Sequence, residues 1–198
     1  MREKRRNAIV VDFDNTLFFT DMCAIRAAKE ITQKKMSIKS IRLLPKIEKH
    51  KIYRLGFAKY YKGAKPNTNM VKRLVRLSKT RPSDALILLS AKPNADKNRV
   101  KYLIDSQGIS FDSFVFRPKK YLFDHDEEWK LVEIGKLLKK YNAIDIYEDK
   151  IDNIKHIAKK LSPANMNYFL VSKNSIRHIS KLPIETTGFN RDIKSVDM

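Results

Sequence analysis

Short apolar runs alternate with helical patterns along most of the chain. Five runs have the length of a strand: 7–13, 85–89, 111–116, 143–147 and 167–171. Four segments between or after them carry apolar residues at helical spacing: 67–79, 95–106, 127–141 and 151–161. Apolar runs bounded by polar residues are typical of strands buried on both faces of a parallel sheet. The pattern therefore predicts an α/β, Rossmann-like fold with a mainly parallel sheet of about five strands flanked by helices.

One segment, 20–62, interrupts this alternation. Its apolar spacing predicts one or two amphipathic helices, over 22–36 and 38–61, and Pro45 would break the second range. Beyond residue 183 the chain shows little apolar periodicity. We therefore expect three parts: a core formed by 1–19 and 63–182, a small helical insertion after the first strand at 20–62, and a C-terminal tail at 183–198.

Positive charge gathers in and beside the insertion. The 198 residues carry a formal net charge of +20, and residues 20–81, with 18 basic and three acidic residues, contribute +15 of it. Tyr53, Phe57, Tyr60 and Tyr61 are interleaved with these cations. Two interpretations stay open. The segment forms a surface for a polyanion or a phosphorylated substrate, or it is a solvated basic face whose aromatic residues dock it on the core.

Several classes of protein are excluded by what the sequence lacks. No apolar run approaches the roughly 20 residues of a bilayer span, so we expect no membrane partner. Asp12 and Asp14 end the first apolar run too early for a signal peptide. The single cysteine, Cys23, can form no internal disulfide, which fits a cytoplasmic protein. The five glycines form no phosphate-binding loop of the ATP or NAD type.

The strongest chemical signal is the sequence Asp12-Phe13-Asp14-Asn15-Thr16, which begins where the first predicted strand ends. Ligands of α/β proteins bind at the carboxyl ends of parallel strands. Two carboxylates separated by one residue can converge there on one site. One can act as a nucleophile or metal ligand and the other as an acid or base.

Three more motifs follow the first one along the chain in the order found in the haloacid dehalogenase-like (HAD) hydrolase superfamily. The chain resembles this superfamily over roughly residues 7–172. Ser90 closes the second predicted strand in LILLSAKP, and Lys130 opens a helix in EEWK. Glu148 and Asp149 end the fourth strand in IYEDKIDNI. Lys119 and Lys120 compete with Lys130 for the role of the motif lysine, and we expect Lys130 because it lies at a helix start.

The resemblance implies an enzyme of the phosphatase branch. In that family the first aspartate forms an aspartyl-phosphate, which assigns this role to Asp12. The second protonates the leaving alcohol and then activates water, which assigns that role to Asp14. Thr16 and Ser90 can supply hydroxyl donors, and Lys130 a positive charge, around the oxygens of a transferring phosphoryl group.

A carboxylate attacks a phosphate dianion readily only where a cation offsets their repulsion, so we expect Mg²⁺ as the cofactor. Asp12 and Asp149 are the expected carboxylate ligands, and the resemblance adds the backbone carbonyl of Asp14. Consecutive strand residues point to opposite faces. Glu148 and Asp149 therefore share the site only if the backbone turns between them, and either could be the direct ligand. We expect Asp149 to bind the ion, with Glu148 and Asp152 behind it and Asp152 orienting metal-bound water.

In the family, an insertion at 20–62 forms a cap over the active site and selects the substrate. A basic cap favours a nucleotide or a nucleic-acid terminal phosphate. The order of ILLSAKP, GISFDSFVFRPKK and YEDKIDNI is similar to that in polynucleotide 3′-phosphatases and deoxyribonucleotidases. Two alternatives stay open: a phosphatase of sugar or other metabolite phosphates, and a catalytically weak nucleic-acid-binding module on the same fold.

Overall fold

The apolar strands assemble into a six-stranded sheet in the order β5-β4-β1-β6-β7-β8. This is a computed structural model, and it describes residues 6–119, 125–161 and 164–180. Five strands are parallel: β1 (Ala8–Val11), β4 (Ala85–Pro93), β5 (Ser113–Arg117), β6 (Ile144–Glu148) and β7 (Met166–Val171). The sixth, β8 (Ile176–His178), is antiparallel to β7. The predicted α/β class with a mainly parallel sheet is confirmed.

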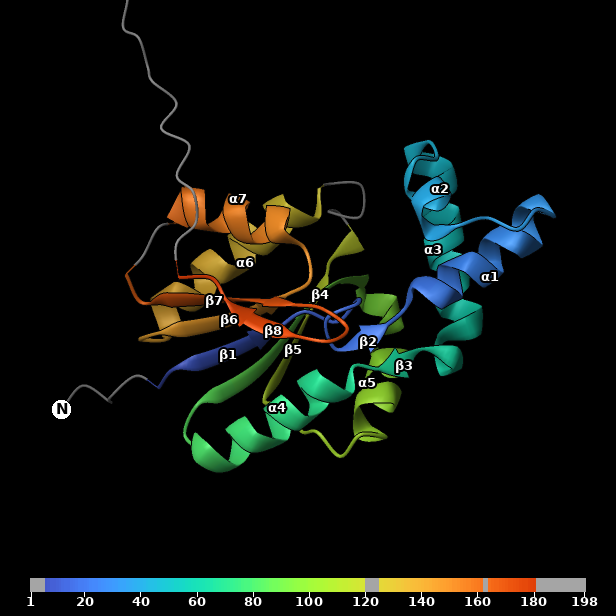
Figure 1. Ribbon diagram of the computed structural model, residues 1–198. Helices are drawn as coiled ribbons and strands as arrows, with labels where there is room; N and C mark the ends of the chain where they lie inside the picture. Colours follow the sequence, from blue (N-terminus) through green and yellow to red (C-terminus); the bar gives the residue numbers. More distant parts are fainter. Residues whose placement is uncertain (1–5, 120–124, 162–163, 181–198) are drawn as a thin grey trace, which may run out of the picture.

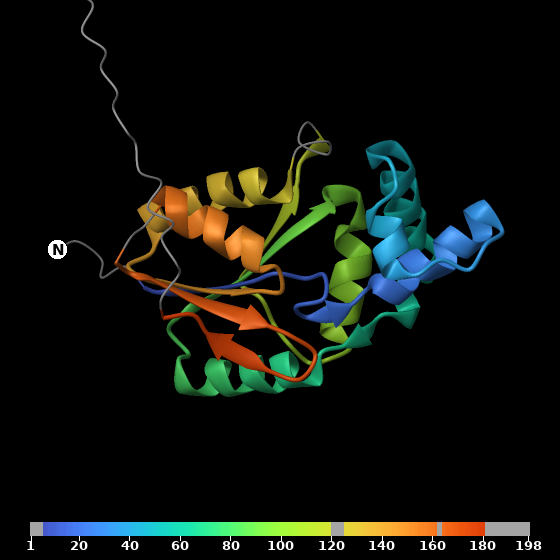
Figure 2. The same cartoon turned by 45° about the horizontal axis from the view of Figure 1, so that its top comes forward.

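Helices cover both faces of the sheet (Figure 2). On one face lie α4 (Thr68–Thr80) and α5 (Lys97–Asp105), and on the other α6 (Asp126–Lys140) and α7 (Ile151–Leu161). Successive side chains of a strand point to opposite faces. Accordingly, Ile9 and Val11 pack with the first pair of helices, and Ala8 and Val10 with the second. Burial on both faces explains why these strands read as continuous apolar runs.

The 20–62 insertion lies beyond the carboxyl end of β1 (Figure 1). It contains α1 (Asp21–Thr32), α2 (Ile38–Arg42) and α3 (Lys46–Tyr60), and the break at Pro45 is present as predicted. A small apolar cluster holds the three helices together: Ala24, Ala27, Ala28, Ile41 and Ile52. None of the helices in the described residues is long and apolar enough to cross a membrane.

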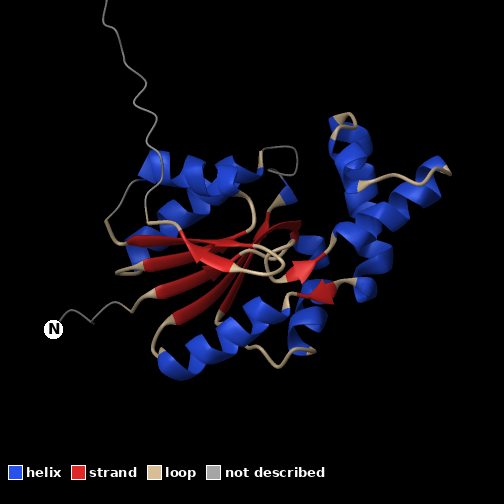
Figure 3. Cartoon of the chain, viewed as in Figure 1, coloured by secondary structure: helices blue, strands red, loops and turns tan. Residues whose placement is uncertain are grey.

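A two-stranded antiparallel pair carries the chain into and out of the insertion (Figure 3). It is formed by β2 (Phe18–Phe19) and β3 (Lys65–Pro66), and the 3-10 turn η1 (Tyr61–Gly63) precedes β3. A second 3-10 turn, η2 (Asn94–Asp96), leads into α5. The division into core, insertion and tail stays a prediction, and the tail at 183–198 lies outside the described residues.

Two helical glycines test how tightly the insertion is packed. A Cβ atom on Gly56 of α3 would lie 2.7 Å from the backbone oxygen of Cys23 in α1, whereas one on Gly135 of α6 would lie 3.9 Å from the nearest side chain. We expect Gly56→Ala to destabilise the protein by ~1–3 kcal/mol through overpacking. The matched Gly135→Ala should stabilise it by up to ~1 kcal/mol through helix propensity. Urea unfolding monitored by circular dichroism measures both changes. Equal effects of the two substitutions would contradict the close approach of α1 and α3.

Candidate active site

Three of the predicted site residues lie at the carboxyl ends of three neighbouring strands. Asp12 directly follows β1, which lies between β4 and β6 in the sheet. Ser90 belongs to β4, and Glu148 is the last residue of β6. Parallel strands end at the same edge, so residues that are far apart in the sequence meet there.

Lys130 of α6 is buried between two carboxylates. Its Nζ lies 2.7 Å from Asp12 Oδ1 and 2.6 Å from Glu148 Oε2, and 4% of its side chain is exposed. Burial opposes the charged form of Lys130, but Asp12 and Glu148 outweigh it and raise the pKa of the amine above its usual range. Lys130 is therefore a fixed positive charge beside Asp12. The alternative Lys119 is exposed, and Lys120 lies outside the described residues.

Three carboxylates converge at this point. Oxygen atoms of Asp12, Glu148 and Asp149 all lie within 4.8 Å of one another. Burial raises the pKa of Asp149 to about 8, and the charges of Asp12 and Glu148 add to the rise. Burial also raises the pKa of Asp12 to about 7, although Lys130 opposes the rise. A single lysine thus leaves negative charge uncompensated, and the all-oxygen donor set fits a hard divalent cation such as Mg²⁺.

The two acidic residues at the end of β6 have different surroundings. Glu148 accepts hydrogen bonds from Lys130, from the Asn153 side chain at 3.0 Å and from the Lys150 backbone at 3.3 Å. Both of its oxygens therefore already have protein donors. Asp149 is partly exposed, whereas Asp152 is exposed in the first turn of α7 and is not part of the carboxylate cluster.

Hydroxyl groups hold the two aspartates of the first motif. Thr16 Oγ1 donates to Asp12 Oδ2 at 3.1 Å, and Thr20 Oγ1 donates to Asp14 Oδ1 at 2.5 Å. Ser90 is fully buried in β4, and its Oγ accepts a hydrogen bond from the backbone nitrogen of Lys92 at 3.3 Å. Each predicted residue of the first two motifs is thus placed at the edge of the sheet where Asp12 lies.

The loop after β1 is shaped by Asn15, which has a left-handed backbone with φ of 57°. Asparagine adopts this region more readily than most residues because its side chain can bond locally. Its Nδ2 donates to Asp21 Oδ1 at 3.1 Å, and its Oδ1 accepts from the Thr20 backbone at 3.3 Å. The loop that carries the two aspartates predicted to be catalytic is therefore tied to the first residue of α1.

A sequence model for HAD domain family 1 in Swiss Army Knife RNA repair proteins matches residues 39–186. The chain belongs to this family. The matched segment includes Ser90, Lys130, Glu148 and Asp149, and the Asp12 loop precedes it. The resemblance to the HAD superfamily is therefore confirmed.

Solved structures share the fold of this HAD domain. The Pnkp1/Rnl/Hen1 complex has a TM-score of 0.54 at 16% identity over 86% of the chain, which spans about half (47%) of that structure's chain. A predicted phosphoglycolate phosphatase from Lactobacillus delbrueckii has a TM-score of 0.56 at 15% identity, and the match covers 83% of this chain and 85% of that one. A hydrolase from Streptococcus pneumoniae has a TM-score of 0.52 at 13% identity, and the match covers 85% of this chain and 94% of that one. No curated protein matches the chain. At these identities the likeness shows a HAD phosphatase-like fold alone.

The sequence motifs of the HAD domain did not reveal Lys92. Its Nζ lies 2.9 Å from Asp14 Oδ1 and 3.6 Å from the centroid of the Phe57 ring in α3. A cation at this distance over an aromatic ring is attracted by its π-electrons. Lys92 therefore connects the second aspartate to the insertion. The sequence did hold a signal, because Lys92 follows Ser90 by two residues in one strand, and such residues share a face.

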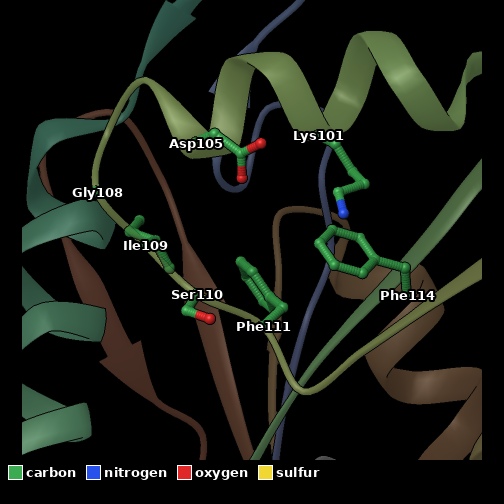
Figure 4. A pocket seen from close by; sticks show the side chains of 7 residues that line it. All are labelled: Lys101, Asp105, Gly108, Ile109, Ser110, Phe111 and Phe114. Carbon is green, nitrogen blue, oxygen red and sulfur yellow. The ribbon is translucent and has the colours of Figure 1, made fainter.

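A separate cavity of about 260 Å³ lies beside β5, the outermost strand on one side of the sheet (Figure 4). It lies between α5 and the segment that leads into β5, and Lys101 faces the Phe114 ring there, 5.3 Å from its centroid. Its lining residues are Lys101, Asp105, Gly108, Ile109, Ser110, Phe111 and Phe114. Since the carboxylate cluster is at the carboxyl ends of the strands, this cavity is not part of the candidate active site.

Proposed function

We propose that the protein is a Mg²⁺-dependent phosphomonoesterase that acts through an aspartyl-phosphate on Asp12. The observation that carries this proposal is the buried contact of Lys130 with both Asp12 and Glu148, next to the partly exposed Asp149. A cluster with this much uncompensated negative charge is costly to keep in a protein, which favours a functional reason for it.

Asp12 acts as the nucleophile, Asp14 as the general acid and base, and Lys130 as a positioning cation. An Asp12 oxygen forms a bond to phosphorus while the bond from phosphorus to the ester oxygen breaks, and Asp14 gives its proton to the departing alkoxide. In the second step Asp14 takes a proton from water, the water oxygen bonds to phosphorus, and the Asp12 carboxylate leaves. Lys130 orients Asp12 and opposes its protonation, because it is a fixed cation 2.7 Å from Asp12 Oδ1.

The ligand positions follow from the same contacts. Glu148 is buried and accepts three hydrogen bonds from protein donors, whereas Asp149 is partly exposed. Asp149 rather than Glu148 is therefore the proposed Mg²⁺ ligand at the end of β6, together with Asp12 and the Asp14 backbone carbonyl. The ion would supply positive charge that offsets the repulsion between Asp12 and a phosphate dianion. Glu148 would fix Lys130 and the first turn of α7, through Asn153.

The proposed substrate is a nucleotide or a nucleic-acid terminal phosphate. The family of RNA repair HAD domains and the fold shared with a chain of the Pnkp1/Rnl/Hen1 complex support this choice. The +15 charge of residues 20–81 supports it as well, because a polyanion gains from clustered cations.

The test is phosphate release from four kinds of monoester: an aryl phosphate, nucleoside monophosphates, oligonucleotides phosphorylated at either end, and sugar phosphates. We expect Mg²⁺-dependent turnover that EDTA abolishes, with the highest kcat/KM for the nucleotide substrates. A preference for sugar phosphates would refute the substrate class. Absence of metal-dependent turnover on every monoester would refute the phosphatase and leave nucleic-acid binding as the function.

The carboxylate cluster predicts an unusual pH dependence of stability. The pKa of Asp149 rises from its ordinary 3.8 to about 8 in the folded protein, so the folded state binds a proton that the unfolded chain has lost. The stabilisation is complete below the unfolded value and is lost as the pH rises through about 8, at ~1.4 kcal/mol for each unit of pKa difference. Asp12, with a pKa raised to about 7, acts in the same direction.

Thermal unfolding measured in EDTA between about pH 5 and 8.5 checks this expectation. We expect the melting temperature of the metal-free protein to fall over this interval, and Mg²⁺ to raise it most at the alkaline end. Asp149→Asn should flatten the profile, because the amide does not titrate. A melting temperature that stays constant in EDTA would contradict the proposed charge excess.

A further inference from the structure

The face of α3 that carries Tyr53 and Phe57 is turned toward the catalytic loop. These residues are one helical turn apart and so share a face. Phe57 is buried and meets the Phe13 ring edge-on, with 5.8 Å between the ring centroids. Phe57 therefore docks the insertion on the core. Tyr53 is 37% exposed and is therefore partly accessible to a ligand.

Arg42, the last residue of α2, lies beside Tyr53. Its guanidinium donates a hydrogen bond to the Tyr53 side chain and lies 3.4 Å, through Nη2, from Asp21 Oδ2. Asp21 is in turn bonded to Asn15 of the catalytic loop. A chain of polar contacts thus places Arg42 relative to the catalytic loop, and 54% of its side chain stays exposed.

Charges at the end of β6 act on the same two side chains. Burial opposes the charged form of Arg42, yet Asp21, Tyr53 and Asp149 together raise its pKa. Burial raises the pKa of Tyr53, and the positive charges of Arg42 and Lys150 oppose that rise. Lys150 directly follows the proposed metal ligand Asp149. Its Nζ lies 2.9 Å from Asp126 Oδ2, and 53% of its side chain is exposed.

We propose that Arg42, Tyr53 and Lys150 form a subsite for the nucleotide adjacent to the one that carries the reacting phosphate. Arg42 and Lys150 bind the phosphate that links the two nucleotides, and the Tyr53 ring stacks on a base. This rests on the proposed phosphatase function and narrows it to substrates of at least two nucleotides.

The chemistry of the three groups fits such a ligand. A guanidinium has five N–H donors and can hold a phosphate through two parallel hydrogen bonds. The contact of Arg42 with Asp21, at 3.4 Å, is looser than the 2.7 Å pair of Lys59 with Glu30 in the same insertion. Arg42 can therefore turn its N–H donors to a ligand with a smaller loss of interaction energy than a tightly paired cation such as Lys59. Bases stack on aromatic rings with little sequence preference, which suits a phosphatase that accepts ends of varied sequence.

The experiment compares kcat/KM for an aryl phosphate, a nucleoside monophosphate and a terminally phosphorylated dinucleotide. For Arg42→Gln we expect the ratio of kcat/KM for the dinucleotide to kcat/KM for the aryl phosphate to fall about tenfold or more. Tyr53→Leu should lower it similarly through lost stacking, and Tyr53→Phe should lower it less because the ring is kept. Lys39→Gln, which removes an exposed cation from the same helix, is the matched control and should keep the wild-type ratio.

Binding provides a second measurement that does not depend on turnover. Fluorescence anisotropy with a labelled oligonucleotide in EDTA should show weaker binding for Arg42→Gln, with the slope of log affinity against log salt reduced by about 1. The subsite is refuted if the dinucleotide and aryl activities fall equally, or if Lys39→Gln and Arg42→Gln weaken binding alike. The proposed function itself fails differently, through the absence of Mg²⁺-dependent turnover in the wild type.

Discussion

Replacement of Asp12 by asparagine should lower phosphate release at least about 1,000-fold, because an amide cannot supply the carboxylate oxygen that attacks phosphorus. The side chain of asparagine has the same shape, and its carbonyl oxygen can still accept the hydrogen bond from Lys130 that Asp12 accepts at 2.7 Å. The fold should therefore persist. Initial rates on the preferred nucleotide substrate, together with circular dichroism of the variant, measure both expectations.

The matched control for this substitution is Asp105→Asn. Asp105 is exposed at the end of α5, at the cavity beside β5, so the control removes one carboxylate without touching the site. We expect its rate to equal that of the wild type. A folded Asp12→Asn protein that keeps a tenth or more of the activity, roughly, would disprove the aspartyl-phosphate on Asp12.

Replacement of Lys130 by methionine should be the most damaging change to the metal-free protein. It leaves the carboxylates of Asp12, Glu148 and Asp149, all within 4.8 Å of one another, without the cation that lies between two of them. Removing one partner of a buried ion pair costs ~3–5 kcal/mol, because the remaining charge stays buried. Turnover should be lost as well, since Lys130 orients Asp12 and offsets phosphoryl charge.

Urea unfolding in EDTA at about pH 8 measures the loss, because the cluster is more charged there than at lower pH. Mg²⁺ should recover part of it, as should a lower pH at which the carboxyl groups are protonated. Lys136→Met in the same helix breaks an exposed pair with Glu133 and should cost under ~1 kcal/mol. Equal stability of Lys130→Met and wild type would contradict the buried position of Lys130.

The parallel strands were predictable from sequence because they are buried on both faces and therefore consist of apolar runs. The strand β8 was not, since Arg177 and His178 are exposed and Ile176 alone gives no pattern. The pair β2–β3 has two residues in each strand, and its pairing depends on contacts that span the whole insertion. Local pattern cannot report such pairings.

The same difference separates the parts of the candidate site. Asp12, Ser90 and Glu148 could be predicted because each lies at the end of a recognisable strand, and the topology then brings them together. The contact of Arg42 with Asp21, 21 residues away along the chain, depends on how α2 packs on α1 and α3, which no spacing in the sequence indicates. The residues proposed to carry the chemistry were thus easier to find than those proposed to bind the neighbouring nucleotide.

The strand pair at the base of the insertion has a consequence for how such proteins diversify. Phe19 pairs with Lys65, so the chain leaves the core and returns to it at neighbouring positions. Lengthening a segment whose ends are already held together costs little conformational entropy, because the loop-closure term grows only slowly with length. The helices between these two residues could therefore be exchanged or extended over evolutionary time while the sheet, the Asp12 loop and Lys130 kept their arrangement.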